Sequence, residues 1–302
     1  MSDETKDAWF AVFLTEFIMM FIINALTLVA FAKTHHLRKR RTYLIMNLTV
    51  ADLGQGVVGG PVTLWFFRTG KQPGHGFKNS YICLMISDIF YVASLGNLAL
   101  ISLERLHATL YPFRHCLVGE RTYYKIIIIG WFGALTLSSV LSVIHMNDAV
   151  AGRNTWIIYI LLILVVLVTS YVIIISKVTR KTPSQQLRSV ISAERKLSVT
   201  LFIVSAASTL TLLPWVITTL ISVLSSGFPW IQFSPHGRIS SIVLAFYYLN
   251  SILNPVIYAF RLPEFRRALK GFFCGNNSSA ARARPLELRV MHTQTVNTTF
   301  GD

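Results

Sequence analysis

The sequence has few charged residues. They make up 14% of its 302 positions, whereas 53% of the residues are hydrophobic. A soluble domain carries about a quarter charged residues, so this composition excludes an ordinary soluble protein. Acids are scarcer than bases, with 13 Asp and Glu against 28 Lys and Arg, and the net charge is +15. Because the cations lie in short segments beside apolar stretches, they indicate membrane orientation, and no nucleic-acid partner is expected.

Cysteine is also sparse, with Cys83, Cys116 and Cys274 as its three occurrences. Cys83 lies at the predicted outer end of an apolar stretch, and the other two lie on the predicted inner side. No outer segment offers Cys83 a partner, so we expect no internal disulfide. We also expect no cleavable signal peptide, because the head of the chain is acidic and the following apolar stretch is too long.

Motifs of catalysis are missing as well. The sequence contains no metal-protease, P-loop or nucleophile-elbow pattern, and its eight His residues lack ligand spacing. Residues 54–59 match the letters of the dinucleotide fingerprint, but they continue an apolar stretch with no strand before them. Close helix packing through Gly56 and Gly60 explains these glycines better. We therefore expect no enzyme and no cofactor.

What the chain does contain is seven apolar stretches, each near or above the ~20 residues that cross a bilayer core. No internal repeat or inverted duplication of the transporter type is apparent. The sequence predicts an all-α membrane protein, a seven-transmembrane helix bundle plus a short amphipathic membrane-surface helix. The predicted spans are 9–32, 43–67, 81–106, 124–146, 156–176, 197–224 and 239–260.

Basic residues gather in the first, third and fifth connections between the spans, and the other connections carry far fewer. By the positive-inside rule the basic connections are cytoplasmic. The prediction is a multi-pass plasma-membrane protein with an extracellular N-terminus and a cytoplasmic C-terminus. Its predicted parts are a short extracellular N-terminus (1–8), the membrane domain (9–260), an amphipathic cytoplasmic helix (261–274) and a disordered cytoplasmic tail (275–302).

The amphipathic helix is predicted from Pro263, a residue suited to a first helical position, and from Phe and Leu residues along one face. Such a helix lies on the membrane lipids. Cys274 at its end is a candidate palmitoylation site. The alternative is an ordinary free thiol.

Polar residues inside the spans need an explanation, because lipid offers them no hydrogen bonds. At ~1.5 Å per residue several of them fall at similar depths in the inner half, which predicts a shared polar layer around Asp52, its one carboxylate. A sodium ion bound there would satisfy that charge. The alternative is a protonated or water-bonded Asp52 in a structural network. The layer comprises Asn24, Asp52, Ser94, Asn97, Asn250, Ser251 and Asn254, of which Asp52, Ser94, Asn250, Ser251 and Asn254 are the candidate ion ligands.

The third span carries a continuous stripe at 100° per residue, which predicts a face turned to the bundle interior. At its cytoplasmic end Arg105 follows Glu104, and Glu194 opens the sixth span at the same level. We expect both acids to hold Arg105 in an ionic latch between the third and sixth helices. The alternative is a solvated cluster at the interface. The stripe consists of Ser87, Tyr91, Ser94, Leu98, Ile101 and Arg105.

The outer half of the bundle offers candidate ligand contacts. Asp88 is the one acid in the outer half of the third span, a counter-ion for a cationic ligand if it faces the cavity. It lies 100° from the stripe, so the alternative is a local bond to a neighbouring helix. For Glu16 and His145 we expect solvated positions at span ends. The candidate ligand residues are Ser87, Asp88, Tyr91, Trp215, Thr219, Tyr247 and Tyr248.

Taken together, these motifs resemble the rhodopsin-like (class A) G-protein-coupled receptors, from about Trp9 to Cys274. The residues that carry the resemblance are Asn24, the segment 47–53 (NLTVADL), Glu104-Arg105-Leu106 with Pro112, Trp131, Tyr171, Pro214 and the segment 254–258 (NPVIY). By this resemblance Arg105 would move from its acid partners to a heterotrimeric G protein and to Tyr171 and Tyr258. Pro214 and Pro255 would bend the sixth and seventh helices. Asp52, Ser94 and Asn250 would form an allosteric sodium site.

The sequence departs from the family pattern at several positions. The outer disulfide is missing, Ile163 replaces the fifth-span Pro, and Leu212 and Ser208 replace the sixth-span aromatic residues. Ser87 stands where amine receptors have Asp, which argues against the usual amine site unless Asp88 substitutes. The seventh span lacks Lys, which excludes a retinal Schiff base. The fourth connection, about 147–155, is also short. Together with these departures, it gives the sequence a weak resemblance to the melanocortin and lipid-receptor cluster.

The expected function is a receptor that binds an unidentified extracellular ligand in the outer cavity and activates a heterotrimeric G protein, with arrestin and receptor dimerisation as possible further partners. One alternative is a transporter or channel that conducts through the polar layer. Another is a receptor-fold protein without a ligand, either constitutive or dimerising.

Overall fold

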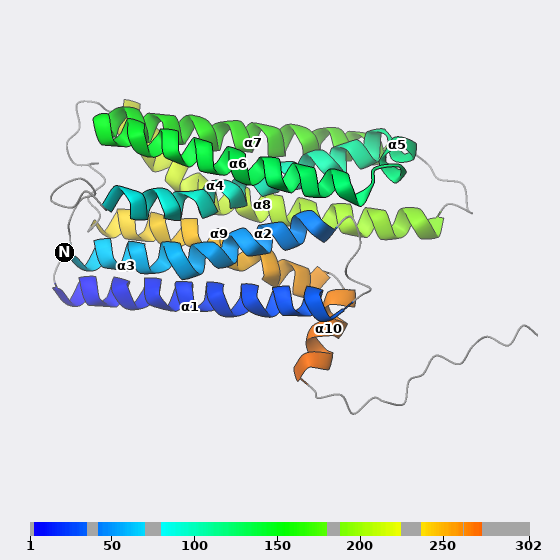
Figure 1. Ribbon diagram of the computed structural model, residues 1–302, viewed down its shortest axis with the longest axis horizontal. Helices are drawn as coiled ribbons and strands as arrows, with labels where there is room; N and C mark the ends of the chain where they lie inside the picture. Colours follow the sequence, from blue (N-terminus) through cyan, green and yellow to red (C-terminus); the bar gives the residue numbers. More distant parts are fainter. Residues whose placement is uncertain are drawn as a thin grey trace, which may run out of the picture.

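The computed structural model describes residues 3–34, 42–69, 80–179, 188–224, 237–261 and 263–273, and all regular elements in these ranges are helices. The long helices run side by side along the longest axis of the molecule (Figure 1). In chain order the elements are α1 (Asp3–Lys33), α2 (Tyr43–Gly54), the π-helix η3 (Gln55–Gly59), α3 (Gly60–Thr69), α4 (Ser80–Leu110), α5 (Pro112–Cys116), α6 (Glu120–Asn147), α7 (Ala149–Thr179), α8 (Arg188–Leu224), α9 (Arg238–Arg261) and α10 (Pro263–Phe273).

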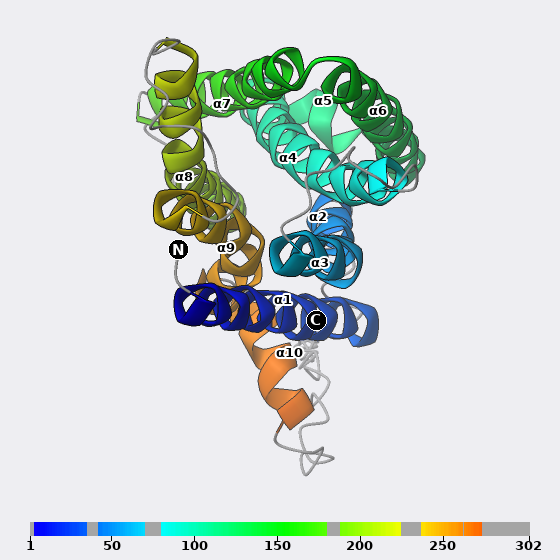
Figure 2. The same cartoon turned by 90° about the vertical axis from the view of Figure 1, so that its left-hand side faces the viewer.

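The arrangement is the predicted seven-helix membrane bundle. Six helices in the described ranges are long and apolar enough to cross a membrane, and the second span is divided among α2, η3 and α3. Viewed along the bundle, α4 passes between α2, α6 and α7, while α9 lies between α1 and α8 (Figure 2). We call the end with Asp3 the outer end and the end with Lys33 the cytoplasmic end, following the charge pattern.

The second span is interrupted because Pro61 has no backbone N–H to donate one turn back. The Gly60 N–H bonds to the Gln55 carbonyl, five residues earlier, which is the π-helical pattern. The glycines here let α1 approach closely, as expected: a Cβ at Gly60 would lie 2.7 Å from Phe17 Cγ. The interpretation of this glycine motif as helix packing is confirmed.

The connection between the fourth and fifth spans is shorter than the predicted 147–155, because α7 already begins at Ala149 and leaves Asp148 alone between two helices. The Asp148 backbone is extended, with φ −149° and ψ 109°. Its carboxylate accepts hydrogen bonds from the Val150 and Ala151 N–H groups at 2.8 and 3.2 Å. These bonds satisfy amides of the first turn of α7, so Asp148 both ends α6 and starts α7.

The tight turn needs Gly152, because a Cβ there would lie 2.5 Å from the Cα of His145 on α6. We expect Gly152→Ala to force the two helices apart and to cost about 1–3 kcal/mol of stability. A thermal unfolding scan of the purified protein measures this loss. Gly133→Ala is the matched control, because nothing lies within 4 Å of its built Cβ. Equal midpoints for the two variants would contradict this account of the turn.

At the cytoplasmic end α10 leaves the bundle beside α1 and α9 (Figure 1). Its Phe265 is buried and packs on Phe31 of α1, with ring centroids 5.5 Å apart. Arg266 and Arg267 are exposed, so the predicted amphipathic helix is confirmed. Cys274 and the predicted tail lie outside the described residues.

Candidate functional site

The predicted stripe of α4 faces the interior along its whole length. Each of its six residues, from Ser87 to Arg105, is no more than 7% exposed. This burial follows from the central place of α4, which packs on α2, α6, α7 and α8. The stripe therefore joins an outer cluster, a middle layer and a cytoplasmic cluster on one helix.

In the cytoplasmic cluster Arg105 is 1% exposed, and its Nε and Nη2 donate to the Glu104 carboxylate. The same carboxylate accepts a hydrogen bond from the Tyr123 hydroxyl at 3.0 Å and lies 3.3 Å from His115 Nε2. The predicted Glu104 part of the latch is thus present. The Glu194 side chain lies outside the described side chains, so its part stays a prediction.

Of the predicted switch residues, Tyr171 lies near this cluster. The Tyr171 hydroxyl accepts a hydrogen bond from Ser205 at 3.3 Å and lies near enough to Arg105 for an electrostatic interaction. Tyr258 is fully buried, and its hydroxyl has no hydrogen-bond partner among the residues that the structure describes. Pro214 and Pro255 lie inside α8 and α9, where each removes one helix hydrogen bond.

The middle layer is centred on Asp52, which is fully buried. Ser94 Oγ donates to one carboxylate oxygen at 2.6 Å, and Asn254 Nδ2 donates to the other at 2.9 Å. Ser251 lies close to the same carboxylate. Asn24 joins α1 to this region, since its amide donates to the Ser251 carbonyl at 3.3 Å. The sequence prediction of a layer shared by four helices is confirmed for these residues.

Several polar atoms in this layer are buried and make no hydrogen bond to any part of the chain that the structure describes. They are both amide atoms of Asn250, the Asn254 Oδ1 and the Asn24 Oδ1. Three of these atoms are amide oxygens, which accept hydrogen bonds, and the Asn250 Nδ2 is a donor. An orphaned buried polar atom costs about 1–3 kcal/mol, so this mixture of donor and acceptors indicates a place for water or, at the oxygens, for a cation. Oxygen atoms beside a carboxylate are what a hard cation prefers. The layer therefore contains oxygen donors of the type that a sodium ion takes, and the ion site stays a prediction.

Asn97 was expected in this layer, and that expectation is wrong. Its Nδ2 donates to the Ala93 carbonyl at 2.9 Å, and its Oδ1 accepts from Asn47 at 2.7 Å. Asn47 in turn accepts from the Trp131 indole at 2.9 Å. Asn97, three residues beyond Ser94, therefore bonds Asn47 of α2 and not Asp52, which lies further along the same helix. Because Asn97 and Ser94 lie at different angles around the helix, the sequence did contain a signal that their side chains point in different directions.

The outer cluster is a continuous set of aromatic rings. Tyr91 stacks on Tyr247, with centroids 4.1 Å apart and planes at 20°. Trp215 lies 6.4 Å and Tyr248 5.2 Å from Tyr247, measured between ring centroids. The Tyr248 hydroxyl shares a 2.8 Å hydrogen bond with Thr63. These four predicted ligand residues therefore come together from α4, α8 and α9.

Sequence reasoning missed two members of this cluster on α7. Trp156 lies 5.8 Å from Tyr91 between ring centroids, and the Tyr159 hydroxyl donates to the Val92 carbonyl at 2.9 Å. Their spacing of three residues places both on one side of α7, which was the available signal. Of the remaining predicted residues, Ser87 is buried against Gly59, and Thr219 donates its hydroxyl to the Trp215 carbonyl of its own helix.

Asp88 lies beside the aromatic cluster. Leu95, seven residues further on the same face of α4, is fully buried, so this face turns inward. The half-buried carboxylate of Asp88 interacts electrostatically with the hydroxyls of Tyr91, Tyr247 and Tyr248. It makes no hydrogen bond or ion pair within the described part of the chain. The alternative of a local bond to a neighbouring helix therefore fails.

Glu16 is also not the solvated residue that was expected. It is half-buried on α1, and its Oε2 is fully buried with no hydrogen-bond partner in the described ranges. It lies between Phe13 and Phe17, whose rings both pack on Tyr248. The correction arises because α1 begins at Asp3, well before the predicted span, and places Glu16 below its outer end.

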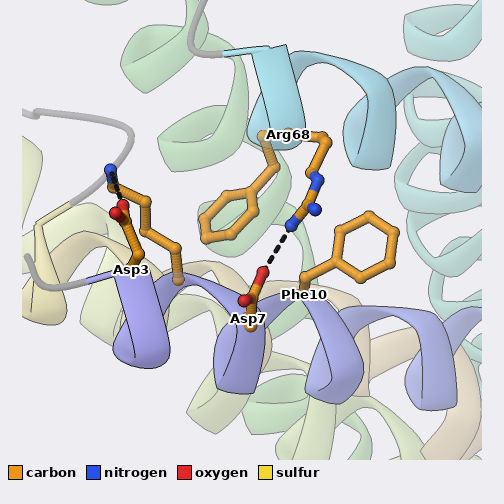
Figure 3. Close-up of a pocket in the computed structure, with 6 residues that line it drawn as sticks. Asp3, Asp7, Phe10 and Arg68 are labelled. Carbon is orange, nitrogen blue, oxygen red and sulfur yellow. Dashed lines mark hydrogen bonds and ion pairs between the residues drawn. The ribbon is translucent and has the colours of Figure 1, made fainter.

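A separate pocket of about 250 Å³ opens at the outer ends of α1 and α3 (Figure 3). Asp7 pairs with Arg68 across it, and Lys6 pairs with Asp3 at 2.9 Å, which holds the pKa of the exposed Asp3 below its ordinary value. No predicted ligand residue lines this pocket. Its lining consists of Asp3, Lys6, Asp7, Phe10, Phe67 and Arg68.

The helix order, the polar layer and the buried Glu104–Arg105 pair define a heptahelical membrane receptor as the class of this protein. The family model described as "7 transmembrane receptor (rhodopsin family)" matches residues 23–158 and 150–258. The chain belongs to this family, which is a family of receptors and not of enzymes. The resemblance seen in the sequence is thereby confirmed.

The chain is similar to trace amine-associated receptor 7c of Rattus norvegicus, with 27% identity over 87% of the chain and 82% of that receptor. Trace amine-associated receptor 5 of Homo sapiens is 25% identical over 83% of the chain and 81% of its own length. Neuropeptide FF receptor 2 of Mus musculus is 22% identical over 46% of the chain and 34% of its length. The relatives thus include receptors named for amines and for a peptide.

Proposed function

We propose that the chain is a plasma-membrane receptor that binds a cationic amine in the outer half of its bundle and activates a heterotrimeric G protein. Asp88 is the counter-ion for the ammonium group. The aromatic side chains of Tyr91, Trp156, Trp215 and Tyr247 form the wall against which the ligand packs. The N-terminus is extracellular in this proposal, so the ligand arrives from outside the cell.

The unpaired carboxylate of Asp88 is the observation that carries the proposal. A charge inside a membrane protein is costly unless a partner compensates it, and Asp88 has none in the described part of the chain. An ammonium group at 4 Å would gain about 4 kcal/mol at an effective dielectric of 20. A neighbouring aromatic face adds about 0.5–2 kcal/mol through a cation–π contact. Neutral ligands gain neither.

The relatives support the same ligand class, because two of them are named for trace amines. Ser87 occupies the position where the family resemblance leads one to expect the amine-binding Asp. Here the carboxylate stands one residue later. Since Ser87 is packed against Gly59, a cation that reaches α4 meets Asp88 and not Ser87.

The proposed signal travels along α4. Asp88 and Arg105 are 17 positions apart, which corresponds to about 26 Å of helix. An amine can shift the equilibrium between the inactive and active states only by as much as its affinity for the active state exceeds its affinity for the inactive state. In the active state Arg105 leaves Glu104 and contacts the G protein, while α8 and α9 rearrange around Pro214 and Pro255.

The middle layer is proposed to hold a sodium ion that favours the inactive state. Asp52→Asn removes the charge that attracts the ion but keeps the shape of the side chain. We expect this variant to lose the sodium dependence of agonist affinity, measured by radioligand competition with sodium or N-methylglucamine chloride. Thr49→Val is the control, because Thr49 is buried on the same helix and bonds the Ile45 carbonyl. Intact sodium dependence in Asp52→Asn would rule out the ion site.

Further partners follow from the proposed class. Arrestin binding to the activated cytoplasmic end, receptor dimerisation and a palmitoyl group on Cys274 are part of this proposal. The amphipathic α10 supports the lipid contact, since it buries Phe265 and exposes two arginines beside the bundle.

The proposal is tested by exposing transfected cells to primary, secondary and tertiary amines and to their neutral analogues, with G-protein dissociation as the readout. Activation by at least one amine, without activation by its neutral analogue, is expected. Activation by neutral lipids or peptides alone would contradict the amine class. Substrate flux in proteoliposomes that lack G protein would instead support the transporter alternative.

A further inference from the structure

The Glu104 carboxylate at the cytoplasmic end is shared by three side chains. Arg105 donates to both of its oxygens, and Tyr123 donates to Oε1 at 3.0 Å. His115 Nε2 lies 3.3 Å from the same Oε1. His115 belongs to the short helix α5, which begins at Pro112 and folds back on α4. A residue outside the helix bundle thus contacts the acid that holds Arg105.

The second ring nitrogen of His115 faces another histidine. Its Nδ1 lies 3.4 Å from Nδ1 of His107 on α4. In a neutral pair one Nδ1 must donate and the other must accept. If His115 accepts, its proton sits on Nε2 and points at Glu104. The contacts therefore assign neutral His115 the Nε2–H tautomer.

Protonation of His115 is accommodated without breaking these contacts. A charged His115 donates from Nε2 to Glu104 and from Nδ1 to His107, which then accepts through its bare Nδ1. His107 must stay neutral for this, because two charged rings at 3.4 Å would repel each other. The arrangement therefore selects His115 as the ring that takes the proton.

The charged groups around His115 act in opposite directions. Glu104 of α4 favours the protonated ring, while Arg105 beyond Glu104 opposes it. On α5 itself, Arg114 lies over the Tyr111 ring at 5.9 Å from its centroid. From α6, Tyr123 bonds Glu104 and is neutral at physiological pH. The ordinary pKa of histidine is about 6.5, so histidine is the side chain whose charge changes most readily near cytoplasmic pH.

We propose that His115 is a proton-operated control of the Glu104–Arg105 pair, through which acidification of the cytoplasmic side raises basal G-protein activation. The charged ring gives Glu104 a second cation to pair with, so Arg105 is held less tightly. This inference rests on the proposed role of Arg105 in coupling. Neutral His115 already donates Nε2–H to Glu104, so protonation adds a positive charge to an existing contact. Tyrosine or asparagine at position 115 would donate a hydrogen bond but would carry no such charge at physiological pH.

The test uses the full-length receptor in lipid nanodiscs with purified G protein, and nucleotide exchange is measured without agonist between pH 6.0 and 7.8. Basal exchange by the wild type is expected to rise about two- to five-fold from pH 7.8 to pH 6.0. His115→Gln keeps a donor to Glu104 but cannot titrate, so its profile gives the pH dependence of the G protein and of every receptor group other than His115. A His107→Gln variant, which leaves His115 in place, retains a rise.

Superimposable profiles for wild type and His115→Gln would overturn the inference. A second measurement does not depend on G protein: the His115 ring signal is titrated by NMR in the wild type and in Glu104→Gln. The pKa of His115 is expected to fall when Glu104 loses its charge. An unchanged pKa would also overturn the inference. If no variant activates any G protein, the proposed function fails, and the NMR titration still decides whether Glu104 controls the proton.

Discussion

Replacing Asp88 by Asn is expected to weaken activation by an amine agonist about 100-fold or more. Removing one partner of a desolvated, close charge pair costs about 2–5 kcal/mol, because the remaining ammonium is left in a site without its counter-charge. Asn has nearly the same shape as Asp, so the packing around Leu95 and Tyr91 is kept. Concentration–response curves for G-protein activation, together with cell-surface expression, measure this effect.

Ser87→Ala is the control for Asp88→Asn. Ser87 is the preceding residue on α4 and occupies the position where amine receptors are expected to carry their acid. If Asp88 is the counter-ion, Ser87→Ala changes amine potency less than about five-fold, the effect of one neutral hydrogen bond. A large loss in Ser87→Ala with normal potency in Asp88→Asn would reverse the assignment.

The seven spans could be predicted from the sequence because lipid leaves little choice. A segment that crosses hydrocarbon must satisfy its backbone within a helix and must be apolar for about 20 residues. The same physics predicted the inward stripe of α4, since a face at helical period with Ser94 and Arg105 cannot lie against lipid. The layer at Asp52 followed from depth alone, because helix rise is constant.

Other features depend on neighbours that one sequence does not specify. The turn at Asp148 could not be predicted, because the sequence does not show that the Asp148 carboxylate caps α7. This cap shortens the connection to one residue. Asn97 lies at the depth of Asp52 but at a different angle, and only the position of Asn47 fixes where its amide points. Asp88 was ambiguous for the same reason. Its side chain faces inward because the buried face of α4 is wider than one stripe.

Histidine positions were the least predictable part of the site. His107 and His115 are eight residues apart and have no ligand or catalytic spacing, so their pattern indicated nothing. Their contact arises because the chain turns at Pro112 and brings α5 back onto α4. Prediction of such a cluster requires the path of a connection, whereas the membrane constrains only the spans.

Replacing Arg105 by Ala is expected to abolish agonist-stimulated G-protein activation while agonist affinity changes less than about three-fold. Arg105 is the one residue of the α4 stripe that carries a charge, and the proposed active state needs this charge at the G protein. Its loss also leaves Glu104 in contact with Tyr123 and His115. Nucleotide exchange in nanodiscs and radioligand binding measure the two properties separately.

Two further variants separate coupling from folding. Arg114→Ala removes an exposed arginine of α5 beside the same surface, and it should retain most of the activation. Glu104→Gln keeps Arg105 but weakens its hold, so basal exchange should rise; the sequence predicts the same for Glu194→Ala. Losing Arg105 is thus expected to lower nucleotide exchange, whereas losing Glu104 or Glu194 is expected to raise it. If the cluster only stabilises the fold, exchange should fall in all three of these variants. A latch requires the signs to differ.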